Sequence, residues 1–168
     1  KIIAKADEVL ANSKASPWDK STAAYLAGAA WQGKEGDNAD ASALKYYQLA
    51  MDNNGLNNNT HYLAMLQVAQ LLAATDHTDE ALKNLRHALH YRPDLGDAHF
   101  ELSLALEDRG KTARAVRHLK EAVRFSPERA EAQLKLARLL RDRGKEEDAI
   151  PHMERALREA VRRSPAAG

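Results

Sequence analysis

Histidine is the side chain in this sequence best suited to hold a metal ion or to move protons near neutral pH. The 168 residues include seven histidines and no cysteine, which excludes disulfides and zinc sites with thiolate ligands. His87 and His90 are three positions apart, and His118 and His152 differ by 34 in residue number. A metal centre needs three or four converging ligands. These histidines instead fall mostly on outer helix surfaces, where we predict solvated or partly packed side chains, no metal site and no cofactor.

Other groups that carry chemistry have structural explanations. Ser16 and Ser126 lie at expected helix ends, where serine caps the helix, and Ser103 lies at an expected packing position. The acidic residues 146–148 fall in a first helical turn, where negative charge complements the helix dipole. Residues 33–36 lack the glycine spacing of a phosphate-binding loop and the preceding strand. No catalytic residue is identified, and we predict that the protein is not an enzyme.

Arginine, which suits phosphate and carboxylate recognition, is distributed unevenly. Residues 1–85 contain none, and residues 86–168 contain all 14. Near the carboxyl end the arginines alternate with acidic residues at spacings of three or four, which favours salt-bridged helix surface over a phosphate-binding track. The net charge of +1 gives no further reason to expect nucleic acid as a partner.

The composition indicates that helices position all of these side chains. Ala and Leu together number 54, whereas the β-branched Ile, Val and Thr together number 13. Such a ratio is typical of an all-α protein. No run of about 18 apolar residues occurs, so we expect no transmembrane segment.

A 34-residue period organises the second half of the chain. The pairs that repeat at this distance are Pro93 and Pro127, Leu102 and Leu136, Gly110 and Gly144, Ala115 and Ala149, His118 and His152, and Ala122 and Ala156. Alanines at these spacings let two helix backbones approach closely, and glycine tolerates the positive φ of a helix-ending turn. The period therefore predicts stacked helix-turn-helix units.

These residues resemble the tetratricopeptide repeat family, a helix-turn-helix of about 34 residues. The match is strongest over residues 96–129, which carry the large-small pair Leu102 and Ser103, the turn glycine and the two alanines of the second helix. The resemblance implies a right-handed α-solenoid of about nine helices.

We predict a single solenoid over residues 1–168. Its parts are an orphan helix at 1–16, a divergent repeat at 17–57, repeats at 58–95, 96–129 and 130–163, and a tail at 164–168. The arginine step at residue 86 falls inside one repeat, so we do not interpret it as a domain boundary. It indicates either a change of surface along one solenoid or a junction of segments of different origin.

The resemblance also implies that the first helix of each repeat lines a concave groove that binds a protein or peptide. The corresponding positions are Leu66, Gln70, Ala73, Phe100, Leu104, Glu107, Leu134, Arg138 and Arg141. Exposed Phe100 and Leu104 would be costly without a partner, so they are candidate anchors unless neighbouring repeats cover them. The chaperone-binding subgroup of the family grips a terminal carboxylate with Lys and Asn. Leu66, Gln70 and Glu101 stand at those positions here, which excludes that ligand.

A second surface is expected on the last helix, where one apolar face has no capping helix after it. Its exposed residues are Ile150, Met153, Leu157 and Val161. We predict that this face binds another copy of the chain, a different protein, or further sequence of the same protein.

Together these features predict a non-enzymatic scaffold that binds a protein partner within a bacterial multi-protein assembly. The alternative is a substrate-recruiting or regulatory domain of a larger enzyme whose catalytic part is absent from this chain. The chain begins at Lys1 inside a helical pattern, and with the absence of cysteine this leaves the periplasm and the cytoplasm both open.

Overall fold

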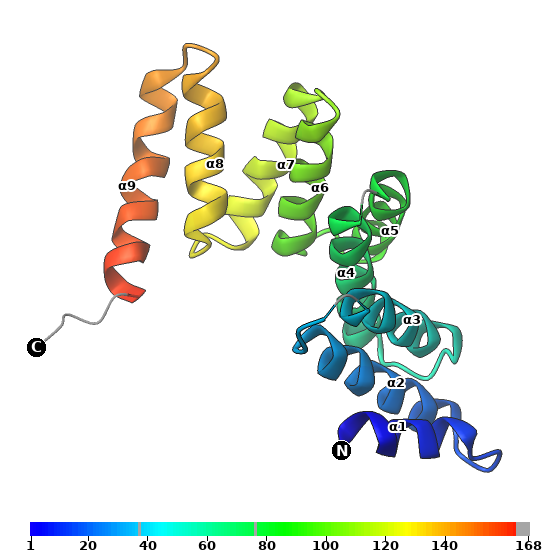
Figure 1. Ribbon diagram of the computed structural model, residues 1–168. Helices are drawn as coiled ribbons and strands as arrows, with labels where there is room; N and C mark the ends of the chain where they lie inside the picture. The colour runs from blue at the N-terminus through cyan, green and yellow to red at the C-terminus, as the bar shows by residue number, and fades with distance from the viewer. Residues whose placement is uncertain (37, 76, 164–168) are drawn as a thin grey trace, which may run out of the picture. The chain divides into compact units, whose positions relative to one another are not determined.

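A computed structural model describes residues 1–36, 38–75 and 77–163, and helices joined by short turns make up these ranges (Figure 1). The nine helices of the described residues are α1 (Ile2–Ala11), α2 (Pro17–Gln32), α3 (Ala39–Asp52), α4 (Asn58–Ala74), α5 (Thr78–Tyr91), α6 (Gly96–Asp108), α7 (Thr112–Phe125), α8 (Ala130–Arg141) and α9 (Glu146–Arg163). The all-α prediction is confirmed. The predicted tail at 164–168 lies outside the described residues.

The chain divides into two compact units, Lys1–Ala88 and Leu89–Gly168. We call them the N-terminal unit and the C-terminal unit. Their boundary falls within α5, two residues after Arg86, the first arginine of the chain. The single solenoid over residues 1–168, its right-handed course and its repeat boundaries stay predictions.

In the N-terminal unit, small residues bring α2 and α3 into close contact around one aromatic ring. Tyr47 is 2% exposed, and a Cβ atom added at Gly28 would lie 2.9 Å from its ring. The Tyr47 hydroxyl donates a hydrogen bond of 2.9 Å to Oε1 of Gln32, and the edge of Tyr25 contacts the ring. Burial raises the pKa of Tyr47 to about 12, so the phenol keeps the proton that it donates.

In the C-terminal unit, α6 packs on α7, α7 on α8, and α8 on α9. The alanines of the 34-residue period lie at these contacts. Ala115 and Ala122 of α7 and Ala149 of α9 are fully buried, and Ala156 of α9 is 2% exposed. The period therefore identified the contact positions correctly, and the close approach of the helices depends on the absence of larger side chains there.

The turn between α6 and α7 and the turn between α8 and α9 have the same backbone geometry. Gly110 and Gly144 have φ angles of +67° and +70°, the left-handed conformation that glycine adopts without steric cost. In each turn the glycine N–H and the N–H of the next lysine donate to carbonyls in the last helical turn. The bonds run from Gly110 N to Glu107 O (2.7 Å), Lys111 N to Leu106 O (2.8 Å), Gly144 N to Arg141 O (2.8 Å) and Lys145 N to Leu140 O (2.9 Å). This pairing of bonds is the Schellman type of helix end.

Two histidines of the 34-residue period take part in matching hydrogen-bond relays. Nε2 of Gln133 donates to the carbonyl of Pro127 (3.1 Å), and Nδ1 of His152 donates to Oε1 of Gln133 (2.7 Å). One repeat earlier, His99 replaces the glutamine. Its Nε2 lies 3.0 Å from the carbonyl of Pro93, and its Nδ1 lies 3.0 Å from Nδ1 of His118. Each relay ties the second helix of a pair to the proline that precedes the first helix.

His118 and His152 are half-buried, so the structure places them among the partly packed histidines rather than the solvated ones. Within the described ranges, no three His, Asp or Glu side chains converge where a metal ion would need them. The relays give these two histidines a structural role that their spacing alone did not reveal.

The repeat register predicts the outcome of enlarging a contact alanine. Replacing Ala122 by Leu adds three carbon atoms at a fully buried helix contact, and we expect the free energy of unfolding to fall by about 1–3 kcal/mol. Ala113→Leu in the same helix is the control, because Ala113 is exposed. Urea unfolding of both variants measures the difference. Equal stability of the two variants would contradict the assigned contacts.

The relay at His152 predicts a pH dependence of stability. Burial lowers the pKa of His152, Lys120 and Arg155 lower it further, and Asp148 partly opposes them. At a pH below about 6.5, the ordinary histidine pKa, the His152 side chain of the unfolded chain binds a proton more readily than that of the folded chain. Stability should therefore fall as the pH decreases from about 6.5 towards the lowered pKa. His152→Gln should make urea midpoints less dependent on pH between about 7 and 5, and an unchanged dependence would refute the assignment.

Candidate partner-binding surface

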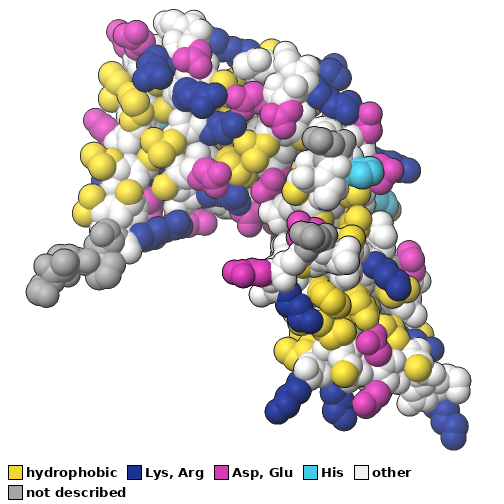
Figure 2. All heavy atoms as spheres, viewed as in Figure 1, with side chains coloured by type: hydrophobic (Ala, Val, Ile, Leu, Met, Phe, Trp, Pro, Cys, Tyr) yellow, Lys and Arg dark blue, Asp and Glu magenta, His cyan; other side chains and the backbone are white. Residues whose placement is uncertain are grey.

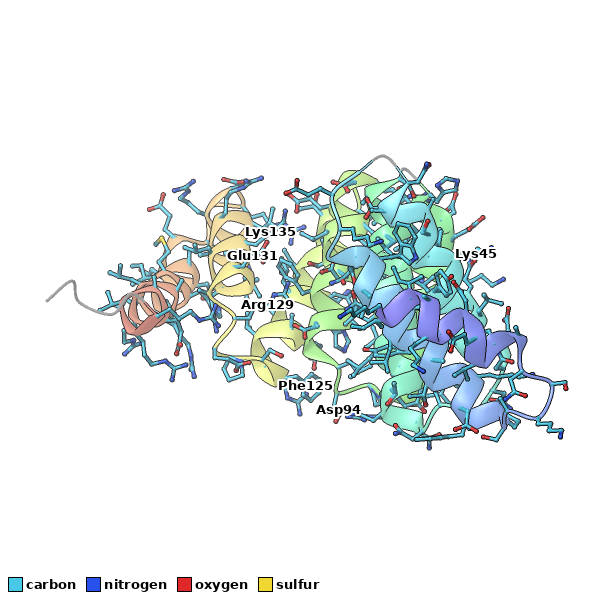
Figure 3. All side chains as sticks on the ribbon, turned by 60° about the horizontal axis from the view of Figure 1, so that its bottom comes forward. Lys45, Asp94, Phe125, Arg129, Glu131 and Lys135 are labelled. Carbon is cyan, nitrogen blue, oxygen red and sulfur yellow. The ribbon has the colours of Figure 1, made fainter. Side chains whose placement is uncertain are left out.

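In the C-terminal unit, α6 and α8 lie side by side and ion pairs join them. Arg129 immediately precedes α8, and its guanidinium reaches the carboxylates of Asp97 and Glu101 on α6. The same guanidinium lies 3.5 Å from the carboxylate of Glu131. Figure 3 shows Arg129, Glu131 and Lys135 on the side of α8 that faces α6. The first contact between the two helices is therefore a cluster of three carboxylates around one cation.

A second cluster lies further along the same two helices. Nζ of Lys135 lies 2.8 Å from Oε2 of Glu107, and Nη2 of Arg138 lies 3.5 Å from Oε1 of Glu107. The Glu107 side chain is 20% exposed and that of Lys135 is 26% exposed, so this pair is partly screened from water. Partial burial strengthens the pairing relative to a fully exposed ion pair. Glu107 is therefore engaged within the protein.

Of the two alternatives for the apolar groove residues, exposure to a partner or cover by neighbouring residues, the structure shows cover for Phe100 and Leu66. Phe100 is 1% exposed, and the guanidinium carbon of Arg129 lies 4.0 Å from the centroid of its ring. This stacking is a cation–π contact that shields the ring from a partner. Leu66 is 5% exposed because α4 is buried around most of its circumference. Neither residue is an accessible anchor.

The nine predicted groove positions divide between the two units. Leu66, Gln70 and Ala73 belong to α4 in the N-terminal unit, where Gln70 is half-buried and Ala73 is exposed. The structure brings the other six together on α6 and α8. They are Phe100, Leu104, Glu107, Leu134, Arg138 and Arg141.

On α8, three of these six residues form an exposed row that we call the α8 row. Leu134 is 54% exposed, the Arg138 side chain is 61% exposed, and Arg141 is exposed as well. Spacings of four and three residues place them on one helix face. Leu104 of α6 is half-buried. The row thus offers one apolar side chain followed by two guanidinium groups, which suit an apolar residue and carboxylates of a bound segment.

Sequence reasoning missed Arg129, Asp97 and Lys135, which organise the pairing between α6 and α8. Arg129 lies just before α8, so helical periodicity does not assign its side chain to a face of that helix. The available signal was the separation of two opposite charges by nearly one repeat, since Asp97 and Arg129 are 32 residues apart in a sequence with a period of 34.

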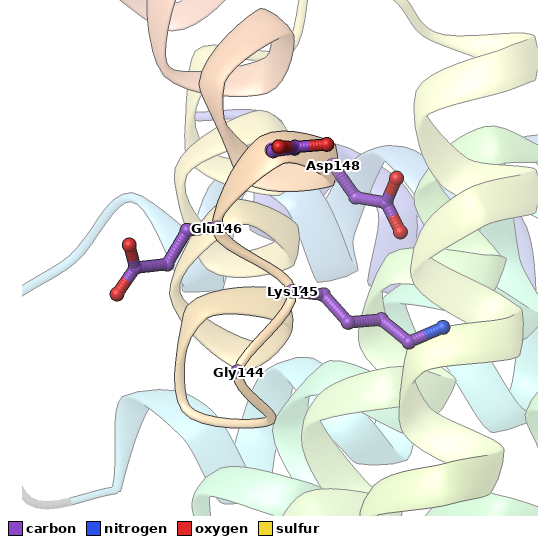
Figure 4. A pocket seen from close by; sticks show the side chains of 5 residues that line it. Gly144, Lys145, Glu146 and Asp148 are labelled. Carbon is purple, nitrogen blue, oxygen red and sulfur yellow. The ribbon is translucent and has the colours of Figure 1, made fainter.

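Hollows also occur at other places on the surface of the described residues. Figure 4 shows one of about 380 Å³ at the turn between α8 and α9, lined by Gly144, Lys145, Glu146, Glu147 and Asp148. In that view Glu146 points away from Lys145 and Asp148, so the side chains do not converge on one point. In the N-terminal unit, an apolar hollow of about 390 Å³ between α1 and α2 has Leu26 and Ile2 in its lining.

The predicted apolar face of the last helix is exposed. Figure 2 shows apolar side chains along α9. The exposed fractions are 48% for Ile150, 39% for Met153, 66% for Leu157 and 66% for Val161. The identity of the partner that binds this face stays a prediction.

Comparison with known proteins identifies the fold. A model of the tetratricopeptide repeat family matches residues 66–130 and 102–167. The chain resembles the crystal structure of MamA with a TM-score of 0.74 at 17% identity, covering 95% of this chain and 87% of that one. For a form of MamA from Desulfovibrio magneticus RS-1 that begins at its residue 41, the TM-score is 0.74 at 15% identity, with coverages of 97% and 86%.

A further solved structure is similar over most of its length. YrrB, described as a TPR protein with an unusual peptide-binding site, matches with a TM-score of 0.68 at 19% identity, covering 94% of this chain and 75% of that one. No curated protein matches the sequence. None of the described helices combines the length and apolar character that a membrane span requires. The two family matches together span residues 66–167, more than half of the chain, and this protein belongs to the tetratricopeptide repeat family.

Proposed function

We propose that the protein is a non-enzymatic scaffold that binds a segment of a partner protein along the α8 row, as a component of a bacterial multi-protein assembly. Tetratricopeptide repeats mediate protein–protein interactions, and the fold is typically non-catalytic. YrrB, which shares the fold, has a peptide-binding site. These likenesses support the class of function, and the chemistry of the α8 row supports the kind of segment.

The proposal depends on the imbalance of charge on α6 and α8. The carboxylates of Glu101 and Glu107 on α6 are engaged by Arg129 and Lys135. Among the described residues, no ion pair involves Arg141. Arg141 therefore leaves accessible positive charge at the end of the α8 row, whereas Arg138 lies 3.5 Å from Glu107 of α6.

An exposed leucine beside this charge defines the expected ligand. Leu134 is 54% exposed and lies one helical turn before Arg138. A bound segment would place an apolar side chain on Leu134 and carboxylates near Arg138 and Arg141. We therefore propose that the partner segment contains an apolar residue with acidic residues close to it in sequence.

Selection from a random peptide library displayed on phage tests this function. Peptides that bind the wild-type protein should combine an apolar residue with two or more acidic residues. Leu134→Asp, and separately the double variant Arg138→Glu with Arg141→Glu, should each weaken binding at least about tenfold, because each removes one kind of contact.

The control is Leu157→Asp, which places the same charge on a leucine of α9 that is also more than half exposed. It should leave peptide binding unchanged, and circular dichroism should show wild-type helicity for every variant. Selected peptides without acidic residues, or peptides whose affinity is unaffected by the α8 variants, would refute the proposed site.

A further inference from the structure

The exposed apolar residues of α9 form one continuous stripe, defined as Ile150, Met153, Leu157 and Val161. At 100° per residue these four positions fall within an arc of about 80° of the helix. The buried alanines of α9, Ala149 and Ala156, point towards a different side, where α8 packs. The stripe is therefore additional to the face that α9 uses within its own repeat.

The stripe is symmetric along the helix. Ile150 and Val161 lie at equal distances on either side of residues 155–156, and so, nearly, do Met153 and Leu157. Two copies of α9 that run antiparallel would place Ile150 of each copy against Val161 of the other. Met153 of each would contact Leu157 of the other. A self-complementary surface of this kind is what a two-fold interface requires.

The charges of α9 change sign along its length. Its first turn carries Glu146, Glu147 and Asp148, and its last turn carries Arg162 and Arg163. Part of this charge is engaged within the chain. Nη2 of Arg162 lies 2.8 Å from Oε2 of Glu159, and Nη2 of Arg163 donates to the carbonyl of Glu128 (3.2 Å).

Three further charged residues lie beside the stripe. Among the described residues no ion pair involves Glu147, Glu154 or Arg158, and all three are exposed. Helical geometry places them on one flank of the stripe, the flank that points away from the buried alanines. In an antiparallel pair the flanks of the two copies lie on the same side of the interface.

We propose that two copies of this chain associate through their α9 stripes in an antiparallel, two-fold arrangement. Glu154 of each copy approaches Arg158 of the other, and Glu147 approaches Arg162. A parallel arrangement would instead set the acidic first turns against each other and the basic last turns against each other. Charge therefore selects the antiparallel orientation, while the apolar stripe supplies the buried area.

The length of α9 limits the strength of this association. Its 18 residues span about 27 Å, and one helix pair of this length buries less surface than a standard stable interface. We expect a reversible dimer with a dissociation constant on the order of ten to a hundred micromolar.

Sedimentation equilibrium of the 168-residue chain over a range of concentrations tests the association. The wild-type protein should shift from monomer to dimer, and Leu157→Glu should raise the dissociation constant at least about tenfold. Leu26→Glu, which alters a 52% exposed leucine of α2, is the matched control and should leave dimerisation unchanged. A wild-type chain that stays monomeric at several hundred micromolar, or a dimer equally sensitive to Leu26→Glu, would overturn the proposal.

Cysteine cross-linking tests the orientation, because the natural chain contains no cysteine. Ile150→Cys and Val161→Cys are prepared as separate variants of different mass and oxidised alone or mixed. The antiparallel pair predicts a disulfide mainly between the two different variants. Disulfides mainly within each variant would show a parallel pair and overturn the arrangement.

A charge exchange tests the proposed ion pair directly. Glu154→Arg should weaken dimerisation by placing two cations together, and adding Arg158→Glu in the same chain should restore it. A double variant no better than the single variant would exclude this contact. Circular dichroism of every variant checks that α9 stays helical.

Discussion

Alanine side chains at the contact positions of α7 and α9 determine how closely the helices of the C-terminal unit approach one another. Ala115, Ala122, Ala149 and Ala156 leave no room for larger groups, so each helix pair packs with its backbones close together. Glycine turns close both pairs with the same hydrogen bonds. Because these contacts recur with the period of the sequence, α6 and α8 are held in register, and their opposite charges meet.

That register separates the surface of the C-terminal unit into two parts with different chemistry. Between α6 and α8, Arg129 and Lys135 form ion pairs with acidic side chains. The residues that stay exposed there are Leu134 and the two arginines of the α8 row. Along α9, the exposed remainder is an apolar stripe bordered by charges of both signs. The first part suits an acidic, partly apolar segment. The second part suits a copy of itself, because its apolar residues are symmetric about the middle of the helix and its charges change sign there, so that opposite charges meet in an antiparallel pair.

The sequence predicted those features that depend on local spacing. The helical composition, the contact alanines and the left-handed glycines follow from residue types at fixed intervals, and the structure confirms them. The burial of Phe100 was not predictable in this way. Periodicity assigns a residue to a helix face, but Arg129, which covers Phe100, lies just before the neighbouring helix α8. The relays through His118 and His152 were missed for the same reason, since each joins groups that are distant along the chain.

The central claim is that the α8 row and the α9 stripe are separate binding surfaces, and leucine methyl NMR tests it most directly. Addition of a peptide selected on the protein should move the methyl signals of Leu134 and leave those of Leu157 in place. Dilution of the free protein should move the methyl signals of Leu157 and leave those of Leu134 in place, because dissociation of the two copies exposes only the α9 stripe. Signals of the two leucines that move together in either experiment would contradict the account.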